Sequence, residues 1–294
     1  MDVASLITLF ICVLVIFLYI RTHYPCRIYE LFNDLSEDKE IPHLIKRTKE
    51  PPVSNIPADV YISWKSHIVP PKMYEVIMGN VKANPEFNFH IYSDEECRNY
   101  IQENYDADVL WAFDTLKPGA YKSDLWRYCI LYKKGGIYMD IKFKVFNPLR
   151  EFLEKNETVF VKDLTNHNVY QGILIAKPDE PIFLEAIRRI VKHCAEKYYG
   201  TDTLDPTGPG LIGNLLEEQG LKHMIKLYNE RNSSEINQHR INVYYYSDKN
   251  KDKLLFQDYN EYRQEQKKYT SIQPHYHDAW HARDIYASSG SHPQ

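Results

Sequence analysis

The alternation of hydrophobic and polar residues predicts a helix followed directly by a buried strand near the middle of the chain. Over 120–134, apolar residues recur at spacings of four and three, which places them on one face of a helix. Lys133 and Lys134 occupy the last turn and two glycines follow, as helix ends prefer. The uncharged run Ile137–Met139 then predicts a short strand. Asp140 would follow its carboxyl end, where ligands bind in open α/β sheets.

Similar patterns predict an ordered series of helices and strands on both sides of this segment. Helices are expected where a proline or a capping residue precedes an amphipathic run, and strands where apolar residues alternate or run together. The expected helices are one that starts at Pro70-Pro71 and runs to roughly Ala83, one opening after Ser93, one from Pro181 to about Tyr199, and one from Pro209 to near Gly220. The expected strands are Asp59–Ser63, Phe87–Ile91, Val159–Lys162, Ile173–Ala176 and Ile241–Tyr246.

The N-terminal run Val3–Ile20 contains 18 residues without a charge, which reaches the lower limit for crossing a bilayer. We interpret it as an uncleaved, single-pass signal anchor rather than a cleaved signal peptide, because the residues before it lack Lys and Arg and no clear cleavage site follows. The polar segment 21–55 is interpreted as a stem or linker, 56–286 as one catalytic domain and 287–294 as a flexible tail.

Composition excludes some classes of protein. The formal charge of −4 argues against nucleic-acid binding, which normally requires a basic excess. The five cysteines are scattered, with neither a C-x-x-C spacing for zinc nor a dense disulfide framework, so buried thiols are expected. A zinc site at the three histidines 275, 277 and 281 is weakly indicated by their spacing alone.

Charged residues in the central segment are candidates for chemistry. Asp124 and Arg127 are three apart and share a helix face. Packed against the strand, that helix could direct both towards the crevice that Asp140 faces. Each residue alone is better explained as a surface ion pair or a turn residue; together, around the Gly-Gly-Ile-Tyr segment, they favour an active site.

These residues also carry a family resemblance. The order S-D-L-x-R-Y (123–128), then L-Y (131–132), then G-G-I-Y-x-D (135–140) resembles the signature of glycosyltransferase family 32. The resemblance implies an α/β fold of GT-A type, a Rossmann-like nucleotide-sugar-binding domain. It also implies sugar transfer from a nucleotide-sugar donor with retention at the anomeric carbon, and a Mn²⁺ or Mg²⁺ cofactor.

The resemblance assigns roles residue by residue. Asp124 would bind sugar hydroxyls, Arg127 the sugar or diphosphate, and Asp140 the ribose or the metal, with His275 as a second metal ligand. Trp64 could stack near the base or be a core residue, and Gln171 stands where the family usually has asparagine. The implied donor-binding residues are Trp64, Ser123, Tyr128, Gly135, Gly136, Gln171 and Trp280.

Lys142 departs from the family pattern, because D-x-D reads Asp140-Ile141-Lys142 here. Residues two apart in an extended segment face the same way, so Lys142 should share the crevice with Asp140. Three outcomes are open. The metal stays and Lys142 adds charge at the diphosphate, which we favour; Lys142 replaces much of the cation's role; or the flexible side chain turns to solvent.

The expected reaction is transfer of a hexose, with mannose from GDP-mannose the first choice, to a glycan or glycolipid hydroxyl. A transferase that uses UDP-galactose or UDP-glucose is the first alternative, and a non-catalytic sugar-binding homologue or a nucleotide-sugar hydrolase the second. The family favours a lumenal domain in the Golgi, which sequons at Asn156 and Asn232 would permit, whereas Arg21 and Arg27 after the span favour the cytoplasm.

Overall fold

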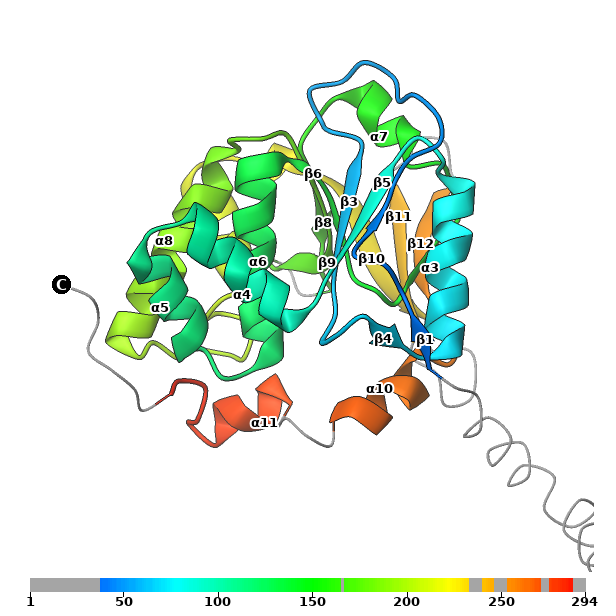
Figure 1. Cartoon of the computed structure of the whole chain (residues 1–294). Helices are drawn as coiled ribbons and strands as arrows, with labels where there is room; N and C mark the ends of the chain where they lie inside the picture. The colour runs from blue at the N-terminus through cyan, green and yellow to red at the C-terminus, as the bar shows by residue number, and fades with distance from the viewer. Residues whose placement is uncertain (1–37, 165–166, 233–239, 246–252, 271–274, 288–294) are drawn as a thin grey trace, which may run out of the picture. The chain divides into compact units, whose positions relative to one another are not determined.

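The computed structural model of the chain describes residues 38–164, 167–232, 240–245, 253–270 and 275–287. The chain divides into two units, Met1–Lys39 and Glu40–Gln294. Only residues 38 and 39 of the first unit are described, so the fold presented below is that of the second (Figure 1). Among the helices of the described residues, none is long and apolar enough to span a bilayer. The predicted anchor Val3–Ile20 and the tail 288–294 lie outside the described residues.

The described part of the chain contains both strands and helices. The strands are β1 (Lys39–Glu40), β2 (Leu44–Ile45), β3 (Asp59–Ser63), β4 (Ile68–Val69), β5 (Asn88–Tyr92), β6 (Gly136–Met139), β7 (Phe143–Val145), β8 (Val159–Lys162), β9 (Val169–Ala176), β10 (Ile225–Asn232), β11 (Arg240–Tyr245) and β12 (Lys253–Asp258). The helices are α3 (Pro71–Ala83), α4 (Asp94–Asn104), α5 (Ala107–Thr115), α6 (Gly119–Lys134), α7 (Arg150–Lys155), α8 (Pro181–Glu196), α9 (Pro209–Glu218), the 3-10 turn η1 (Lys222–Met224), α10 (Tyr262–Thr270) and α11 (Tyr276–His281).

Ten strands of the described residues form one mixed sheet, in the order β2-β5-β3-β6-β9-β8-β10-β11-β12-β7. The pairs β3–β5, β3–β6 and β8–β10 are parallel, and the other neighbours are antiparallel. Only residues 140–142 separate β6 from β7, although the two strands stand at the fourth and tenth positions of the order. Asp140 and Lys142 therefore lie where the chain leaves the parallel part of the sheet for its last strand.

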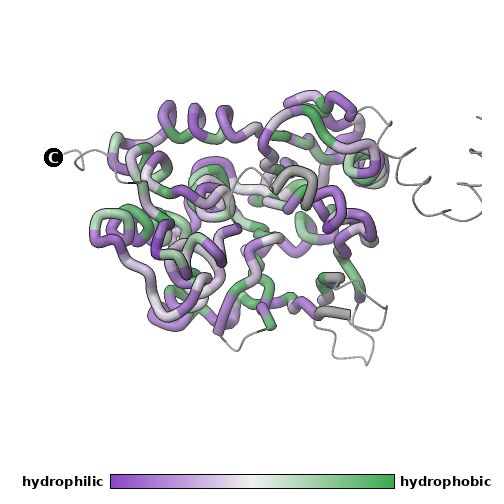
Figure 2. The backbone as a smooth tube through the Cα atoms, turned by 90° about the horizontal axis from the view of Figure 1, so that it is seen from below, coloured by the Kyte–Doolittle hydropathy of each residue, from purple (hydrophilic) through white to green (hydrophobic). Residues whose placement is uncertain are grey.

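Helices cover both faces of this sheet, and two hydrophobic cores result. Figure 1 shows α4, α5, α6 and α8 on one side and α3 on the other. In β6, Tyr138 belongs to the first core, whereas Ile137 and Met139 belong to the second, because successive side chains of a strand point to opposite faces. The helices carry both hydrophilic and hydrophobic residues along their length (Figure 2), as expected of helices that bury one face.

The stem predicted for residues 21–55 is corrected by the structure for its last part. β2 pairs antiparallel with β5 and so forms the edge of the main sheet. Ile41 is 1% exposed and packs in the second core. Ser54 donates a hydrogen bond to the side chain of Asn156 at 3.2 Å. The folded unit therefore begins at Glu40 rather than Ile56. The prediction failed because the charges and prolines of this segment resemble those of a linker. The few apolar residues of the segment are too widely spaced to show the periodicity of a helix or a strand.

Most of the predicted elements are confirmed, with boundary shifts of one or a few residues. The helix and strand of the central segment are α6 and β6, and Asp140 follows β6 as expected. The capping box of α4 is present, since the Ser93 hydroxyl accepts from the Glu96 amide and the Glu96 carboxylate accepts from the Ser93 amide. Cys97, Cys129 and Cys194 are free and buried, as expected of structural thiols.

Gly135 and Gly136 form the link between α6 and β6, and both have positive φ, 64° and 99°. A Cβ on Gly136 would lie 2.6 Å from the carbonyl oxygen of Asp59, which belongs to the neighbouring strand β3. These glycines stand at the opposite end of β6 from Asp140. Backbone conformation and close strand packing therefore explain both residues.

We expect Gly136→Ala to lower the free energy of unfolding by at least about 2 kcal/mol, because it combines an unfavourable φ with a clash against backbone. The matched control is Gly79→Ala, in the exposed part of α3, where a Cβ would meet nothing within 4 Å. That change should instead stabilise by about 0.5 kcal/mol. Denaturant unfolding followed by circular dichroism measures both. Equal effects of the two substitutions would contradict the packing argument.

Candidate functional site

A cavity of about 490 Å³ opens at the edge of the sheet where β3 and β6 end. This volume suits a small-molecule site. Its lining includes Ser63 and Trp64 from the end of β3, and Asp163 just after β8. Tyr262 of α10 and Tyr276 of α11 line it as well. Because β3 and β6 are parallel, their carboxyl ends meet at this edge, which is where open α/β sheets bind ligands.

Asp140 and Lys142 form an ion pair inside this cavity. The Lys142 ammonium donates to Asp140 Oδ2 at 2.7 Å, and the Tyr138 hydroxyl donates to Asp140 Oδ1 at 2.9 Å. The Lys142 side chain is only 13% exposed, and its ammonium lies 5.6 Å from the centre of the Tyr170 ring. Lys142 therefore shares the crevice with Asp140, and the alternative that it turns to solvent is wrong.

The charges of this pair reinforce one another. Burial alone would raise the pKa of Asp140, but the positive charges of Lys142 and Arg127 and the hydrogen bonds from Lys142 and Tyr138 lower it to about 2. Burial would lower the pKa of Lys142, yet Asp140 holds it well above its ordinary value. Both groups are therefore ionised at neutral pH, so Asp140 can accept from a ligand and Lys142 can face an anion.

Asp124 and Arg127 form a second pair, on the face of α6 that lines the cavity. Arg127 Nη1 lies 3.3 Å from Asp124 Oδ1. Both residues are buried, at 7% and 6% exposed. Asp124 Oδ2 accepts from the Thr207 hydroxyl at 2.8 Å. A Cβ on Gly208 would lie 2.7 Å from Asp124 Oδ2, so the segment before α9 can approach Asp124 closely only with glycine at 208.

Arg127 is held rigidly by its surroundings. Its Nη1 donates to the Gln171 carbonyl at 2.6 Å, and its Nε and Nη2 donate to the carbonyl and hydroxyl of Ser123 at 3.1 and 2.9 Å. The guanidinium lies 4.3 Å from the centre of the Tyr138 ring, a cation–π distance. Burial opposes its charge, but Tyr138 and Asp124 raise the pKa of Arg127. The result is a fixed positive charge at the cavity wall.

The pKa of Asp124 differs sharply from that of Asp140. Burial raises the pKa of Asp124 to about 6, and Asp140 adds to this rise, although Arg127 and the Thr207 hydroxyl lower it. Two carboxylates of one cavity thus have separated pKa values. Such separation is frequent where carboxylates carry out chemistry.

Several of the predicted site residues line the cavity. Trp64, Ser123, Gln171 and His275 are all part of its wall. The amide of Gln171 is engaged within the protein, however, because its Oε1 accepts from the Tyr128 hydroxyl at 2.8 Å and its Nε2 donates to the Val169 carbonyl at 2.8 Å. Gln171 therefore shapes the wall, and its backbone carbonyl fixes Arg127.

Four of the predicted donor-binding residues are not brought to the cavity wall. Tyr128 is fully buried behind it, with its hydroxyl between Gln171 and the Thr207 carbonyl. Gly135 and Gly136 occupy the far end of β6. Trp280 donates from Nε1 to the Tyr199 carbonyl at 2.7 Å and packs there, although the same α11 segment brings Tyr276 to the cavity. Each of these four residues has a structural role that explains its presence.

Tyr138, Asp163 and Thr207 are site residues that were not assigned from the sequence. Tyr138 contacts both pairs, as the donor to Asp140 and as the ring beneath Arg127. Asp163 follows the end of β8 and lines the cavity. The same rule that selected Asp140, an acidic residue directly after a buried strand, could have found Asp163. Thr207 gave no such signal, because its partner Asp124 is 83 residues away.

The residues of the cavity are compatible with a divalent cation that the donor helps to bind. Asp140 is ionised, and a carboxylate has about four lone-pair positions, of which Lys142 and Tyr138 use two. Mg²⁺ is commonly held by one or two carboxylates together with substrate phosphates rather than by a cage of protein ligands. His275 lines the same cavity. Asp140 is therefore the residue that would hold the ion, and His275 would be the further ligand that the family resemblance implies.

His277 and His281 are exposed on α11 and are not in the cavity wall. Their Nε2 atoms lie 3.2 Å apart. His275 instead caps α11 by accepting from the His277 amide. The three histidines therefore do not converge on one point as a zinc site would require.

Comparison with known proteins shows what the central segment of this chain is similar to. Residues 70–160 match the family described as "Glycosyltransferase sugar-binding region containing DXD motif", which confirms the resemblance to glycosyltransferase family 32. This region contains α6, β6 and the Asp140–Lys142 pair.

The most similar relatives include mannosyltransferases of fungi. The chain is 27% identical over 144 residues to the initiation-specific alpha-1,6-mannosyltransferase of Candida albicans, covering 47% of this chain and 37% of the relative. It is 23% identical over 158 residues to inositol phosphoceramide mannosyltransferase 3 of Schizosaccharomyces pombe, covering 52% and 43%. The matches thus span less than half of the length of these relatives. A solved structure, "PaToxG Glycosyltransferase", aligns with a TM-score of 0.45 and 14% identity over 68% of this chain and 79% of that one.

Proposed function

We propose that this chain is a metal-dependent glycosyltransferase of GT-A type that moves a sugar from a nucleotide-sugar donor to a hydroxyl of a glycan or glycolipid. One observation carries the proposal. Two ion pairs, Asp124–Arg127 and Asp140–Lys142, reach a single cavity from separate elements, at the carboxyl ends of parallel strands. This arrangement lies within the region that matches the sugar-binding family.

The chemistry requires that negative charge on the leaving diphosphate be stabilised as the glycosidic bond breaks. Arg127 and Lys142 supply fixed positive charges at the cavity, and each is held in place by hydrogen bonds before any ligand binds. Charges that are already oriented cost no reorganisation during the reaction. A divalent cation on Asp140 would add Lewis-acid stabilisation of the same diphosphate charge. Retention at the anomeric carbon is part of the proposal.

Asp124 is proposed to hold the donor sugar. A buried, ionised carboxylate accepts hydrogen bonds from sugar hydroxyls, and such contacts place the anomeric carbon for attack. Thr207 and Arg127 fix the orientation of this carboxylate. The aromatic side chains of Trp64 and Tyr276 in the cavity wall provide faces on which the base or sugar could stack.

Mannose from GDP-mannose is the proposed donor, because both of the relatives described above are named as mannosyltransferases. The test is a panel of nucleotide-sugars, incubated with the purified chain and Mn²⁺, with mass detection of products and NMR of the new anomeric centre. A transferred mannose supports the proposal. Transfer from UDP-galactose or UDP-glucose alone would change the donor, free sugar would indicate a hydrolase, and no product from any donor would indicate a sugar-binding homologue.

We expect a pH dependence that reports Asp124. As pH falls through about 6, Asp124 takes up a proton and loses the negative charge that strengthens its hydrogen bonds to sugar hydroxyls, so kcat/KM should fall there. The contribution of Asp124 to the free energy of unfolding should change with pH in the opposite direction to kcat/KM. The folded pKa is raised above the ordinary 3.8, so the contribution of Asp124 to stability is full below that value and is lost as pH rises through about 6.

Thr207→Val tests whether Asp124 causes this fall in kcat/KM at low pH. The Thr207 hydroxyl lowers the pKa of Asp124, so its removal should shift the fall in kcat/KM to higher pH. Thr115→Val is the matched control, since Thr115 is equally buried but lies at the end of α5. If kcat/KM falls at the same pH in Thr207→Val as in the unmodified chain, another group is titrating.

A further inference from the structure

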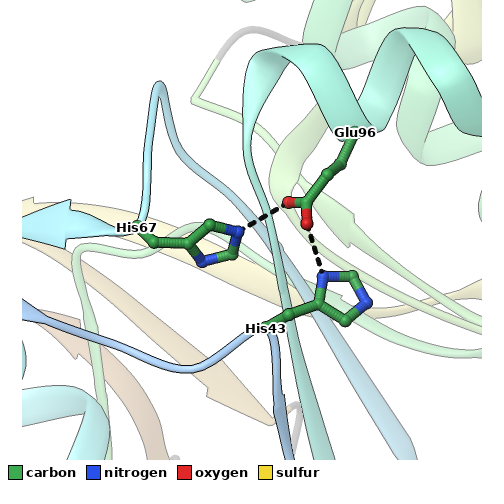
Figure 3. A group of neighbouring side chains, drawn as sticks. All are labelled: His43, His67 and Glu96. Atoms are coloured by element: carbon green, nitrogen blue, oxygen red, sulfur yellow. Dashed lines mark hydrogen bonds and ion pairs between the residues drawn. The ribbon is translucent and has the colours of Figure 1, made fainter.

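Three side chains outside the cavity converge on one point (Figure 3). His43 precedes β2, His67 lies in the loop between β3 and β4, and Glu96 is in the first turn of α4. His43 Nδ1 lies 3.1 Å from Glu96 Oε1, and His67 Nε2 lies 2.7 Å from Glu96 Oε2. Each of the three residues offers one possible metal-ligating atom, and these three atoms all lie within 4.8 Å of one another.

Helix capping does not account for the two histidines. Glu96 completes the capping box by accepting from the Ser93 amide at 2.7 Å, and a lone glutamate or glutamine does this in other helices. Among the described residues, the buried Nδ1 of His67 has no hydrogen-bond partner, so Nε2 makes the polar contact that orients the ring. The capping box of α4 therefore explains Glu96 but does not explain why both imidazoles face its carboxylate.

The geometry suits a small divalent transition metal. Zinc binds imidazole nitrogen at about 2.0–2.1 Å and carboxylate oxygen at about 2.0–2.2 Å in a tetrahedron, which spaces ligand atoms roughly 3.3 Å apart. The His43–Glu96 contact is within about 0.2 Å of this spacing, and the His67–Glu96 contact is about 0.6 Å shorter. Two nitrogens and one carboxylate oxygen are ligands of intermediate softness, which zinc prefers and which Mg²⁺ does not.

We propose that His43, His67 and Glu96 form a zinc-binding site, with water in the fourth position. The three side chains are 43%, 26% and 34% exposed, so the ion can enter from solvent. The site is separate from the cavity and does not depend on the proposed transferase activity. Its ion is distinct in kind from the Mn²⁺ or Mg²⁺ proposed for Asp140.

This zinc site joins three segments that chain folding brings together. His43 belongs to the segment that the sequence predicted to be a stem. His67 lies two residues after Lys65, and Glu96 two residues after Asp94, and both Lys65 and Asp94 line the cavity. Bound zinc therefore ties the first edge strand to two parts of the cavity wall, and it should stabilise the folded chain.

A second histidine pair must be removed before the site is tested. His277 and His281 are four residues apart on α11 with their Nε2 atoms 3.2 Å apart, so they offer zinc two ligands of their own. The background protein is therefore the full chain with His277→Ala and His281→Ala. Neither residue lines the cavity.

The experiment measures zinc binding to this background protein by calorimetry and metal analysis after dialysis, and thermal unfolding with ZnCl₂ or MgCl₂. We expect one zinc per chain and a higher melting temperature with zinc but not with magnesium. Glu96→Gln keeps the cap yet loses the carboxylate ligand, and His67→Ala loses a nitrogen, so each should weaken zinc binding by about 100-fold or more. Glu95→Gln, an exposed change in the same helix turn, is the control and should bind normally.

Two results would overturn the proposal. One is the absence of zinc binding to the background protein at micromolar zinc. The other is zinc binding and zinc-dependent stabilisation that are unchanged in both Glu96→Gln and His67→Ala, since binding would then arise elsewhere. Circular dichroism of the metal-free variants shows that each is folded.

Discussion

Asp140→Asn should lower kcat/KM for sugar transfer by about 1,000-fold, because it removes an ionised group from the cavity wall. Asparagine keeps the shape and can still accept from the Tyr138 hydroxyl, which donates to Asp140 at 2.9 Å. What is lost is the negative charge that orients Lys142 and that would hold the cation. A steady-state assay with the donor identified by the panel measures the effect. Turnover near that of the unmodified chain would refute the assignment of Asp140.

The same substitution should also destabilise the fold, by about 3 kcal/mol, because Lys142 is left with its charge poorly exposed and its partner gone. Replacing an exposed carboxylate at a strand end should lower the free energy of unfolding much less. Asp114→Asn is the matched control. Asp114 pairs with Arg98 at 2.7 Å, but both side chains are about 40% exposed, so the cost should be below about 1 kcal/mol. Activity must therefore be compared at a temperature where circular dichroism shows both variants folded.

Lys142→Ala should lower kcat/KM by about 100-fold, and the remaining activity should still require Mn²⁺ or Mg²⁺. The ammonium is fixed 2.7 Å from Asp140 and faces the cavity, so its loss removes one of the charges proposed for the diphosphate. One ammonium has half the charge of a divalent ion and offers no coordination, since it has no lone pair. EDTA should therefore abolish activity in both the unmodified chain and the variant.

Two outcomes would contradict this expectation, and they differ in meaning. Full activity of the unmodified chain in EDTA would show that Lys142 has replaced the cation. An unimpaired Lys142→Ala protein would show that the side chain plays no part in donor use. Lys144→Ala is the control, because Lys144 lies two residues after Lys142, on β7, but is exposed, and it should leave kcat/KM unchanged.

The sequence by itself determined the central segment of this protein and much of its site. α6, its lysine-rich end and β6 follow from local rules, because apolar spacing and helix-end preferences depend on residues close in the chain. Lys142 faces Asp140 as the sequence predicted, but through a turn rather than an extended segment, since the Phe143 amide donates to the Asp140 carbonyl at 3.1 Å. The motif that contains Asp124 and Arg127 could be matched to a family because its residues are consecutive or nearly so.

Only the tertiary structure decided which residues meet across long separations. Thr207 reaches Asp124 over 83 positions, and His43, His67 and Glu96 meet although they come from the segment before β2, the β3–β4 loop and the first turn of α4. No local pattern encodes such contacts, since they depend on strand order and crossovers. For the same reason Tyr128 and Trp280 match the family pattern yet pack behind or beside the cavity: the sequence records a residue's type and position, while its accessibility to a ligand depends on what packs against it.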